Sequence, residues 1–227
     1  MLLNFQLDTG GTPQALTTKL HTLIIAGWAG RDRAAIEHHI EELAAIGVPR
    51  PSQVPLYYRV AANQLTQDET VQVVGPHSSG ELEAFVFAHA GELYVSLVSD
   101  HTDRKLETVS VALSKQVCAK PVARAAWRYA DVAGHWDELR VRAHIVEDGR
   151  EVLYQDGGLD SLRTAAELIA GYTGGGALPD GVGMSCGTVA AIGGIRPASE
   201  FSMSLHDPRG GRSITHRYRI DALPEVA

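Results

Sequence analysis

The chain has few cysteines, no excess of basic charge and no long apolar run. Its two cysteines, Cys118 and Cys186, lie far apart, which predicts neither a disulfide framework nor a zinc site. The 20 basic residues are outnumbered by 27 acidic ones, and no basic block suits a phosphate backbone. No apolar run approaches the roughly 18 residues that a membrane-spanning helix needs, and residues 1–11 lack the features of a signal peptide. We therefore expect a cytoplasmic protein with neither a nucleic-acid nor a membrane partner.

The composition is that of an ordinary globular domain. The chain has 227 residues, 44% of them hydrophobic, and contains no repeat or linker. We expect one domain over residues 1–227, in which residues 1–50 form an N-terminal strand and a short helix and residues 51–227 form a β-rich body. Strand-like segments are found at 71–74, 81–88, 92–98, 139–146 and 151–154. The predicted fold class is α+β with a majority of strands.

Two short helices and one further strand complete this outline. Residues 19–26 form an apolar run of strand length. After Asp32, a good N-cap residue, apolar residues recur at helical spacing until Gly47. Asp160 is expected to open a second helix, and Gly171 with Gly174, Gly175 and Gly176 to end it. The turn residues Asp148 and Gly149 predict a hairpin between the last two strands.

Three carboxylates are the candidate metal ligands. Glu81 and Glu83 lie two apart at the head of a strand, so their side chains share one face of it. Asp100 follows directly after the strand at 92–98. Neighbouring carboxylates repel each other unless a cation lies between them, and Mg²⁺, Mn²⁺ or Ca²⁺ prefers such oxygen ligands. The alternative is that Glu81 and Glu83 lie on a solvated edge strand and that Asp100 caps a turn.

His39 and Glu42 form a candidate general-base pair. They are three residues apart on the first predicted helix, so they lie on one surface of it. A carboxylate that accepts a hydrogen bond from one ring nitrogen raises the basicity of the other, which suits the activation of a water molecule. The alternative is a partly exposed pair, His38 and His39, on an acidic helix.

The segment from Gly183 to Gly187 matches the G-x-S-x-G pattern of a serine nucleophile. That mechanism requires a long helix after Ser185, but Gly193, Gly194 and Pro197 interrupt any helix there. A serine hydrolase is therefore the weakest alternative. Neither G-x-G-x-x-G after a strand nor a Walker loop is present, so nucleotide binding has no support.

Taken in order, these motifs resemble the fumarylacetoacetate hydrolase family, and specifically its DUF2848 branch. The resemblance covers most of the chain and rests on an H-x-x-E helix, an E-x-E strand, a D-x-S/T segment, a lysine, a glutamine and a glycine loop. In this sequence the matching residues are His39 and Glu42, Tyr58 and Arg59 at the end of 55–59, Glu81 and Glu83, Asp100 and Thr102, Lys115 or Lys120, Gln155, and Gly187 and Thr188 after Cys186.

The resemblance implies a fold and an activity. The fold would be a mixed β-sandwich roll with a few short flanking helices, and the protein would be a homodimer that binds Mg²⁺, or Mn²⁺ or Ca²⁺, through Glu81, Glu83 and Asp100. The substrate would be a small 2-oxo, enol or diketo acid. The implied reaction is hydrolysis of a carbon–carbon bond, with decarboxylation and isomerisation as variants. His39 and Glu42 would act as the base, and Lys115, or in second place Lys120, would balance the substrate's charge. The other residues above would bind the substrate.

Several departures from the family pattern leave a second possibility open. Asp103 and Arg104 replace the usual R-D pair, Cys186 and Val189 change the glycine loop, and Arg59 stands where lysine is usual. A catalytically silent member of the same fold that binds a small carboxylate would also fit these changes.

Overall fold

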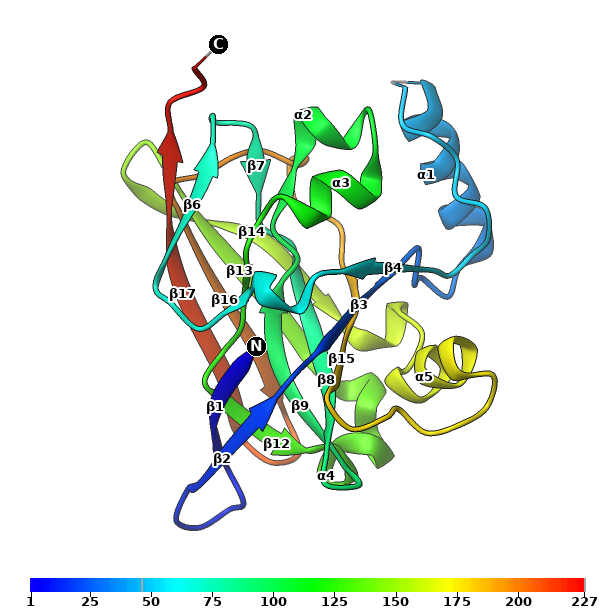
Figure 1. Cartoon of the computed structure of the whole chain (residues 1–227), viewed down its shortest axis with the longest axis vertical. Coiled ribbons are helices and arrows are strands. Elements are labelled where there is room, and N and C mark those ends of the chain that lie inside the picture. Colours follow the sequence, from blue (N-terminus) through cyan, green and yellow to red (C-terminus); the bar gives the residue numbers. More distant parts are fainter. Residues whose placement is uncertain (46, 227) are drawn as a thin grey trace.

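Two β-sheets packed face to face make up most of the molecule (Figure 1). The computed structural model describes residues 1–45 and 47–226, and the description does not extend to the side chains of His39 and Leu43. The larger sheet has the strand order β2-β1-β12-β9-β8-β15-β3-β4. Its strands are β1 (Leu2–Leu7), β2 (Gln14–Lys19), β3 (Thr22–Gly27), β4 (Leu56–Val60), β8 (Leu82–His89), β9 (Glu92–Ser99), β12 (Ala125–Arg128) and β15 (Val182–Thr188).

The smaller sheet has the order β14-β13-β16-β17-β6. Its strands are β6 (Thr70–Val74), β13 (Arg140–Glu147), β14 (Arg150–Gly158), β16 (Glu200–Asp207) and β17 (Arg212–Leu223). Parallel pairs (β1 with β12, β15 with β3, β17 with β6) stand among antiparallel ones, so both sheets are mixed. Two short pairs join β5 (Leu65–Thr66) to β11 (Lys120–Pro121) and β7 (Ser78–Ser79) to β10 (Thr102–Asp103).

The helices are short and lie at the edges of the sheets. They are α1 (Arg33–Ala45), α2 (Arg104–Glu107), α3 (Val111–Gln116), α4 (Tyr129–Val132) and α5 (Ala165–Thr173), with 3-10 turns at Ala62–Gln64, Ala133–Glu138 and Leu159–Ser161. With 47% strand and 21% helix, the predicted α+β class with a mixed β-sandwich roll is confirmed. Among the described residues, no helix is both long and apolar enough to cross a membrane.

The main core lies between the two sheets. Leu82, Ala84 and Val86 alternate along β8 and face this core, where they join inward residues of β13, β16 and β17. The predicted hairpin of β13 and β14 is confirmed, and both residues of its turn, Asp148 and Gly149, have positive φ.

A second core fills the curl of the larger sheet. Phe85 and Phe87 face away from the smaller sheet, and Phe87 stacks on Phe5 of β1 with 4.5 Å between ring centroids. Glu83 is the preceding residue on the same face of β8 and is only 3% exposed. The period-two prediction for Glu83 and the phenylalanines is therefore confirmed, and this carboxylate lies at the end of an apolar interior.

Two predicted boundaries are wrong. The run 19–26 is divided, because the chain turns at residues 20 and 21 and the His21 N–H donates to the Gly181 carbonyl at 2.9 Å. The second helix begins at Ala165 rather than Asp160, since Thr164 and Glu167 form a capping box that fixes its start. The first helix begins as predicted, with the Asp32 carboxylate accepting the N–H groups of Ala34 and Ala35.

Gly183 lies where β15 crosses the second core, and we predict that a methyl group there destabilises the fold. A Cβ at this position would lie 2.5 Å from the Phe85 ring, so Gly183→Ala should lower the free energy of unfolding by about 1–3 kcal/mol. Urea denaturation measures this. Gly134→Ala is the matched control, because nothing lies within 4 Å of a Cβ there. Equal stability of the two variants would contradict the packing described.

Candidate metal centre

Three carboxylates converge where β8 begins and β9 ends. The two strands are antiparallel with Leu82 opposite Ser99, so the residues flanking this pair, Glu81, Glu83 and Asp100, come together. The Asp100 N–H also donates to the Glu81 carbonyl at 2.8 Å. Each of the three offers a carboxylate oxygen, and these atoms lie within 4.8 Å of one another. Within the described part of the chain, this is the one such group of three.

Glu83 is held in place by β15. Its Oε2 accepts hydrogen bonds from the Ser185 hydroxyl and, at 2.7 Å, from the Gly187 N–H, which leaves Oε1 as the oxygen that can bind a cation. Burial, and then the charges of Asp100 and Glu81, raise the pKa of Glu83 to about 8. A carboxyl group in these surroundings is stable as an anion at neutral pH only when a cation is added.

Asp100 is bound by two lysines. Lys115 Nζ lies 2.5 Å from its Oδ2, and Lys120 Nζ lies 3.0 Å from its Oδ1. Burial alone would raise the pKa of Asp100, but the two ammonium groups outweigh it and lower the pKa to about 2. Asp100 is therefore an anion, although it is 1% exposed, and its Oδ1 has no hydrogen bond of good geometry.

Glu81 is oriented by Arg104, which the sequence analysis noted only as a departure from the family pattern. An Arg104 guanidinium nitrogen lies 3.0 Å from Glu81 Oε1, and a second lies 3.0 Å from Glu107. Lys115 Nζ is 3.7 Å from the other Glu81 oxygen. Asp103 caps α2 by accepting the Leu106 N–H, so the order Asp103-Arg104 is what places the arginine first in the helix, against Glu81.

The three side chains fit a hard divalent cation. All donors are carboxylate oxygens, which Mg²⁺, Mn²⁺ and Ca²⁺ prefer. A buried Asp100 oxygen without a hydrogen bond and a Glu83 carboxyl with a raised pKa are both groups that a cation would stabilise. The residues to hold the ion would be Glu81, Glu83 and Asp100.

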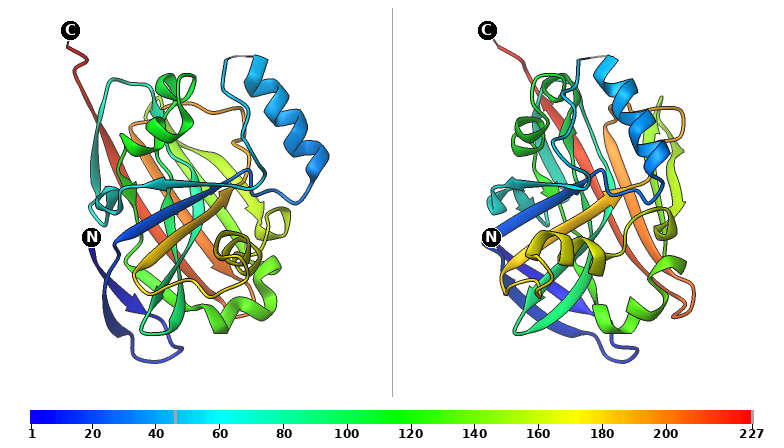
Figure 2. Two further views of the ribbon diagram at one scale, coloured as in Figure 1. Left: turned by 45° about the vertical axis from the view of Figure 1, so that its right-hand side comes forward. Right: turned by 90° about the vertical axis from the view of Figure 1, so that its right-hand side faces the viewer.

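A cavity of about 710 Å³ opens onto Glu81, Glu83 and Lys115. Its other walls come from the end of β3, from α1 and from the loop after β15, which Figure 2 shows beside one another. Tyr58 lines it, with Lys115 Nζ 5.8 Å from the centre of its ring. The Tyr58 hydroxyl accepts a hydrogen bond from the indole N–H of Trp28. Trp28 was not predicted as a site residue. Gly27 could have pointed to it, because a glycine there indicates the turn in which Trp28 has a φ of 60°.

Gln155, Gly187 and Thr188 line the cavity, but their donors point into the protein. The Gln155 amide donates to the Thr188 hydroxyl at 2.8 Å and to the Val189 carbonyl at 2.6 Å, and its oxygen accepts the Leu82 N–H. The Thr188 hydroxyl donates to the Leu82 carbonyl, and the Gly187 N–H is bound to Glu83. These residues shape the wall and orient Glu83.

Three predicted substrate-binding residues lie outside the cavity lining. Arg59 follows Tyr58 on β4, and adjacent strand residues point to opposite faces, so Arg59 is exposed beside Tyr172. Thr102 donates its hydroxyl to the Asp100 carbonyl, and Lys120 lies behind Asp100 with its ammonium group also bound to the His101 carbonyl. Of the two candidate lysines, the structure places Lys115 on the cavity.

The predicted general-base pair, His39 and Glu42, lies in part outside the described residues. The side chain of His39 lies outside them. The Glu42 side chain is 59% exposed and lies 3.3 Å from His38 Nε2, and Glu42 does not line the cavity. Residues 35 and 36 of the same helix do line it.

Ser185 does not have the setting of a hydrolase nucleophile. It lies inside β15, is 1% exposed and is bonded to Glu83, and a loop rather than a helix follows the strand. A strand-to-helix turn, which would expose the hydroxyl, is therefore absent around Ser185.

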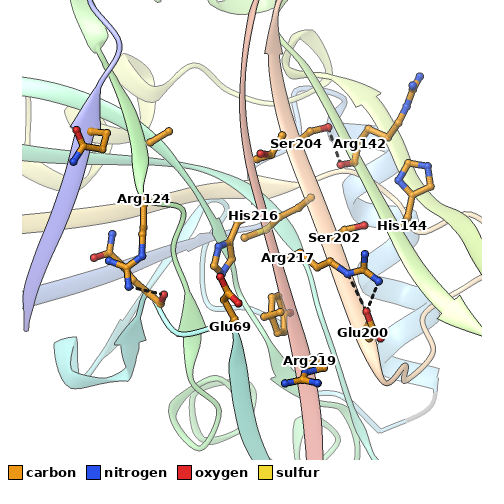
Figure 3. A pocket seen from close by; sticks show the side chains of 16 residues that line it. Glu69, Arg124, Arg142, His144, Glu200, Ser202, Ser204, His216, Arg217 and Arg219 are labelled. Carbon is orange, nitrogen blue, oxygen red and sulfur yellow. Dashed lines mark hydrogen bonds and ion pairs between the residues drawn. The ribbon is translucent and has the colours of Figure 1, made fainter. Parts of the chain in front are cut away.

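A larger groove of about 940 Å³ lies on another part of the molecule and shares no residue with the cavity (Figure 3). It follows β13, β16 and β17, and most of its labelled side chains are arginine, histidine or serine. Arg217 is paired with Glu200, and Arg142 is paired with Asp156 at 2.9 Å. The described acids and histidines of this groove form no cluster of metal ligands.

We predict that Glu83→Gln stabilises the metal-free protein relative to wild type as pH rises, and that it abolishes stabilisation by a metal ion. The pKa of a glutamate in the unfolded chain is near 4.3, whereas the pKa of Glu83 in the folded chain is about 8, so the folded state binds this proton more tightly. The metal-free fold therefore loses stability as pH rises from about 4.3 to 8. In EDTA, the melting temperature of Glu83→Gln relative to wild type should therefore increase over this range. Added Mn²⁺ should stabilise only the wild type.

The exposed Glu151→Gln is the matched control, and it should follow the wild type in both buffers. A melting-temperature difference between wild type and Glu83→Gln that is independent of pH would contradict the electrostatic description of Glu83.

Comparisons with known proteins agree with this architecture. The solved structure of Cg1458 with an inhibitor is 16% identical, with a TM-score of 0.65, and the match covers 93% of this chain and 81% of that one. A 2-keto-3-deoxyarabinonate dehydratase in a hexagonal crystal form is 16% identical over 93% of this chain and 78% of that one, with a TM-score of 0.65. A 2-keto-3-deoxy-D-arabinonate dehydratase complexed with magnesium and 2,5-dioxopentanoate is 14% identical, with a TM-score of 0.64, and the match covers 90% of this chain and 75% of that one.

No curated protein matches the chain in sequence. The family described as a protein of unknown function, DUF2848, matches residues 26–218, which is most of the chain. The chain belongs to the DUF2848 family.

Proposed function

We propose that this chain is a divalent-metal-dependent enzyme that acts on a small 2-oxo acid. The observation that carries the proposal is the convergence of Glu81, Glu83 and Asp100 beside a cavity that can hold a small molecule. Glu81, Glu83 and Lys115 line this cavity. A structural neighbour that is named for a 2-keto acid and contains magnesium supports the same class of chemistry. Mg²⁺ is our first choice, with Mn²⁺ and Ca²⁺ as substitutes.

The protein side chains would hold the site rigid and balance its charge. Ser185 and Gly187 fix Glu83, and Arg104 fixes Glu81, so the carboxylates are already oriented before any ligand arrives. When bound, a divalent cation would polarise the 2-oxo group and stabilise the negative charge that develops on its oxygen. Lys115 would add a second positive charge at the cavity wall. Burial alone would lower the pKa of Lys115, but the charges of Asp100 and Glu81 outweigh it, raise the pKa and keep the ammonium group protonated.

The proton would be moved by His39, oriented by Glu42, as the H-x-x-E motif suggests. Support for this part comes from the position of α1, whose residues 35 and 36 line the cavity one turn before position 39. Our first choice of reaction remains hydrolysis of a carbon–carbon bond. Dehydration is the second candidate, because the structural neighbours include a dehydratase. In both reactions, negative charge develops on the oxygen of the 2-oxo group when the enolate forms. The expected cytoplasmic homodimer stays a prediction.

We predict that Ser185→Ala retains activity and weakens metal binding. The hydroxyl donates to Glu83 and would not attack substrate, so its loss should raise the Kd for Mn²⁺ by roughly 10–100-fold. At saturating Mn²⁺, turnover of a 2-oxo acid should remain within about tenfold of wild type. Complete loss of turnover with unchanged metal affinity would instead favour a nucleophilic serine.

We predict that His39→Ala lowers kcat for a reactive 2-oxo acid by roughly 10²-fold or more and leaves the Kd for Mn²⁺ unchanged. The neighbouring exposed residue offers the control, and His38→Ala should retain activity. A broad panel of 2-oxo and diketo acids, followed by the loss of substrate, provides the assay. If wild type consumes none of them while still binding Mn²⁺ and oxalate, the chain is a carboxylate-binding protein rather than an enzyme.

A further inference from the structure

The cavity has a charge pattern that limits its ligand to one carboxylate. Among the described residues that line it, Lys115 is the one cationic side chain, and it already lies against Asp100. The remaining charged residues of the lining are acids, namely Asp32, Glu81, Glu83 and Glu107. A second carboxylate on the ligand would lose its hydration without gaining a cationic partner.

Three uncharged polar side chains of the wall, those of Gln155, Thr188 and Ser161, already donate to groups of the protein. Both N–H groups of the Gln155 amide bond to Thr188 and Val189, and the Thr188 hydroxyl bonds to the Leu82 carbonyl. The Ser161 hydroxyl donates to the Gly158 carbonyl at 2.9 Å. A ligand tail with several hydroxyl groups would therefore find few donors and acceptors in this wall.

Apolar side chains form the part of the wall away from the carboxylates. They come from α1, from the loop after β15 and from the segments between elements: Ala29, Ala35, Ile36, Val48, Leu162, Val189 and Ile195. Ile36 packs against Gly30, where a Cβ would lie 3.2 Å from it, so this side of the wall is tight. Such a surface gains free energy only when it covers an apolar group.

We propose that the substrate is a 2-oxo acid with a single carboxylate and an aliphatic tail, which lies along α1 and the loop after β15. The inference rests on the proposed function for the 2-oxo acid end. It adds that the chain discriminates against dicarboxylates and against sugar acids such as the 2-keto-3-deoxyarabinonate named for its structural neighbour. Each methylene buried on this wall should tighten binding roughly fourfold.

Calorimetric titration of the Mn²⁺-loaded protein tests this with a matched pair of ligands. 2-Oxohexanoate and 2-oxoadipate have the same carbon chain and differ in whether it ends in a methyl or a carboxylate group. We expect 2-oxohexanoate to bind at least about tenfold tighter than 2-oxoadipate and than pyruvate, which lacks the tail. 2-Keto-3-deoxyarabinonate should bind no tighter than pyruvate.

Oxalate binding distinguishes a failure of the proposed metal-dependent function from a failure of the inference about the tail. If oxalate does not bind, the metal-dependent function itself is wrong. If oxalate binds but 2-oxoadipate or 2-keto-3-deoxyarabinonate equals or exceeds 2-oxohexanoate, the function stands and the inference about the tail is overturned.

A cation placed on α1 should weaken the preference for 2-oxohexanoate over 2-oxoadipate. Ala35 lines the cavity and Ala34 does not, and both are exposed in the first turn of α1. Ala35→Arg should improve the binding of 2-oxoadipate relative to 2-oxohexanoate by roughly tenfold, whereas Ala34→Arg should leave the ratio as in wild type. An unchanged ratio in Ala35→Arg would contradict the placement of the tail along α1.

Discussion

Repulsion among three closely spaced carboxylates, two of them buried, is the constraint on which the rest of the site depends. Glu81, Glu83 and Asp100 lie within 4.8 Å of one another at the end of an apolar interior, where charge is poorly screened. The positive charges of Lys115, Lys120 and Arg104 offset this repulsion: Lys115 contacts both Asp100 and Glu81, Lys120 contacts Asp100, and Arg104 contacts Glu81. Two of the acids are thereby matched, whereas Glu83 receives only neutral donors from Ser185 and Gly187. Among the described residues, Glu83 is thus the carboxylate of the three whose charge no salt bridge offsets.

Next to the carboxylates, a chain of hydrogen bonds between uncharged side chains links the two sheets. His101 bridges Ser78 at 2.9 Å and the Tyr218 hydroxyl at 3.0 Å, and Tyr218 also bonds to Ser99 at 2.8 Å. Burial, and then the nearby Lys120 and Arg104, lower the pKa of His101 to about 3. A neutral imidazole can donate from one nitrogen and accept at the other, so this network adds rigidity without adding charge to a crowded site.

The sequence predicted the parts of the site that follow from local geometry. Period two along β8 and a carboxylate directly after β9 made Glu81, Glu83 and Asp100 candidates, and the family resemblance favoured a metal site over a solvated edge strand and a turn cap. Arg104 could not be assigned because its reach to Glu81 depends on how α2 packs on β7. The same limit applies to Gln155 and Thr188, whose positions on the cavity were predicted but whose hydrogen bonds depend on long-range packing. Arg59 was misplaced relative to Tyr58 because the family motif was read without the alternation of a strand.

The distance along the chain between Glu83 and its donors has a consequence for folding. Ser185 and Gly187 lie 102 and 104 residues after Glu83, whereas Asp100 belongs to the next strand. The β8–β9 hairpin can therefore gather the three acids early, through local contacts, but Glu83 acquires its fixed orientation only when β15 docks between β8 and β3. A folding intermediate with this hairpin alone would hold a loose, weakly chelating cluster. Tight binding of the proposed cation would thus be a kinetic marker for completion of the larger sheet.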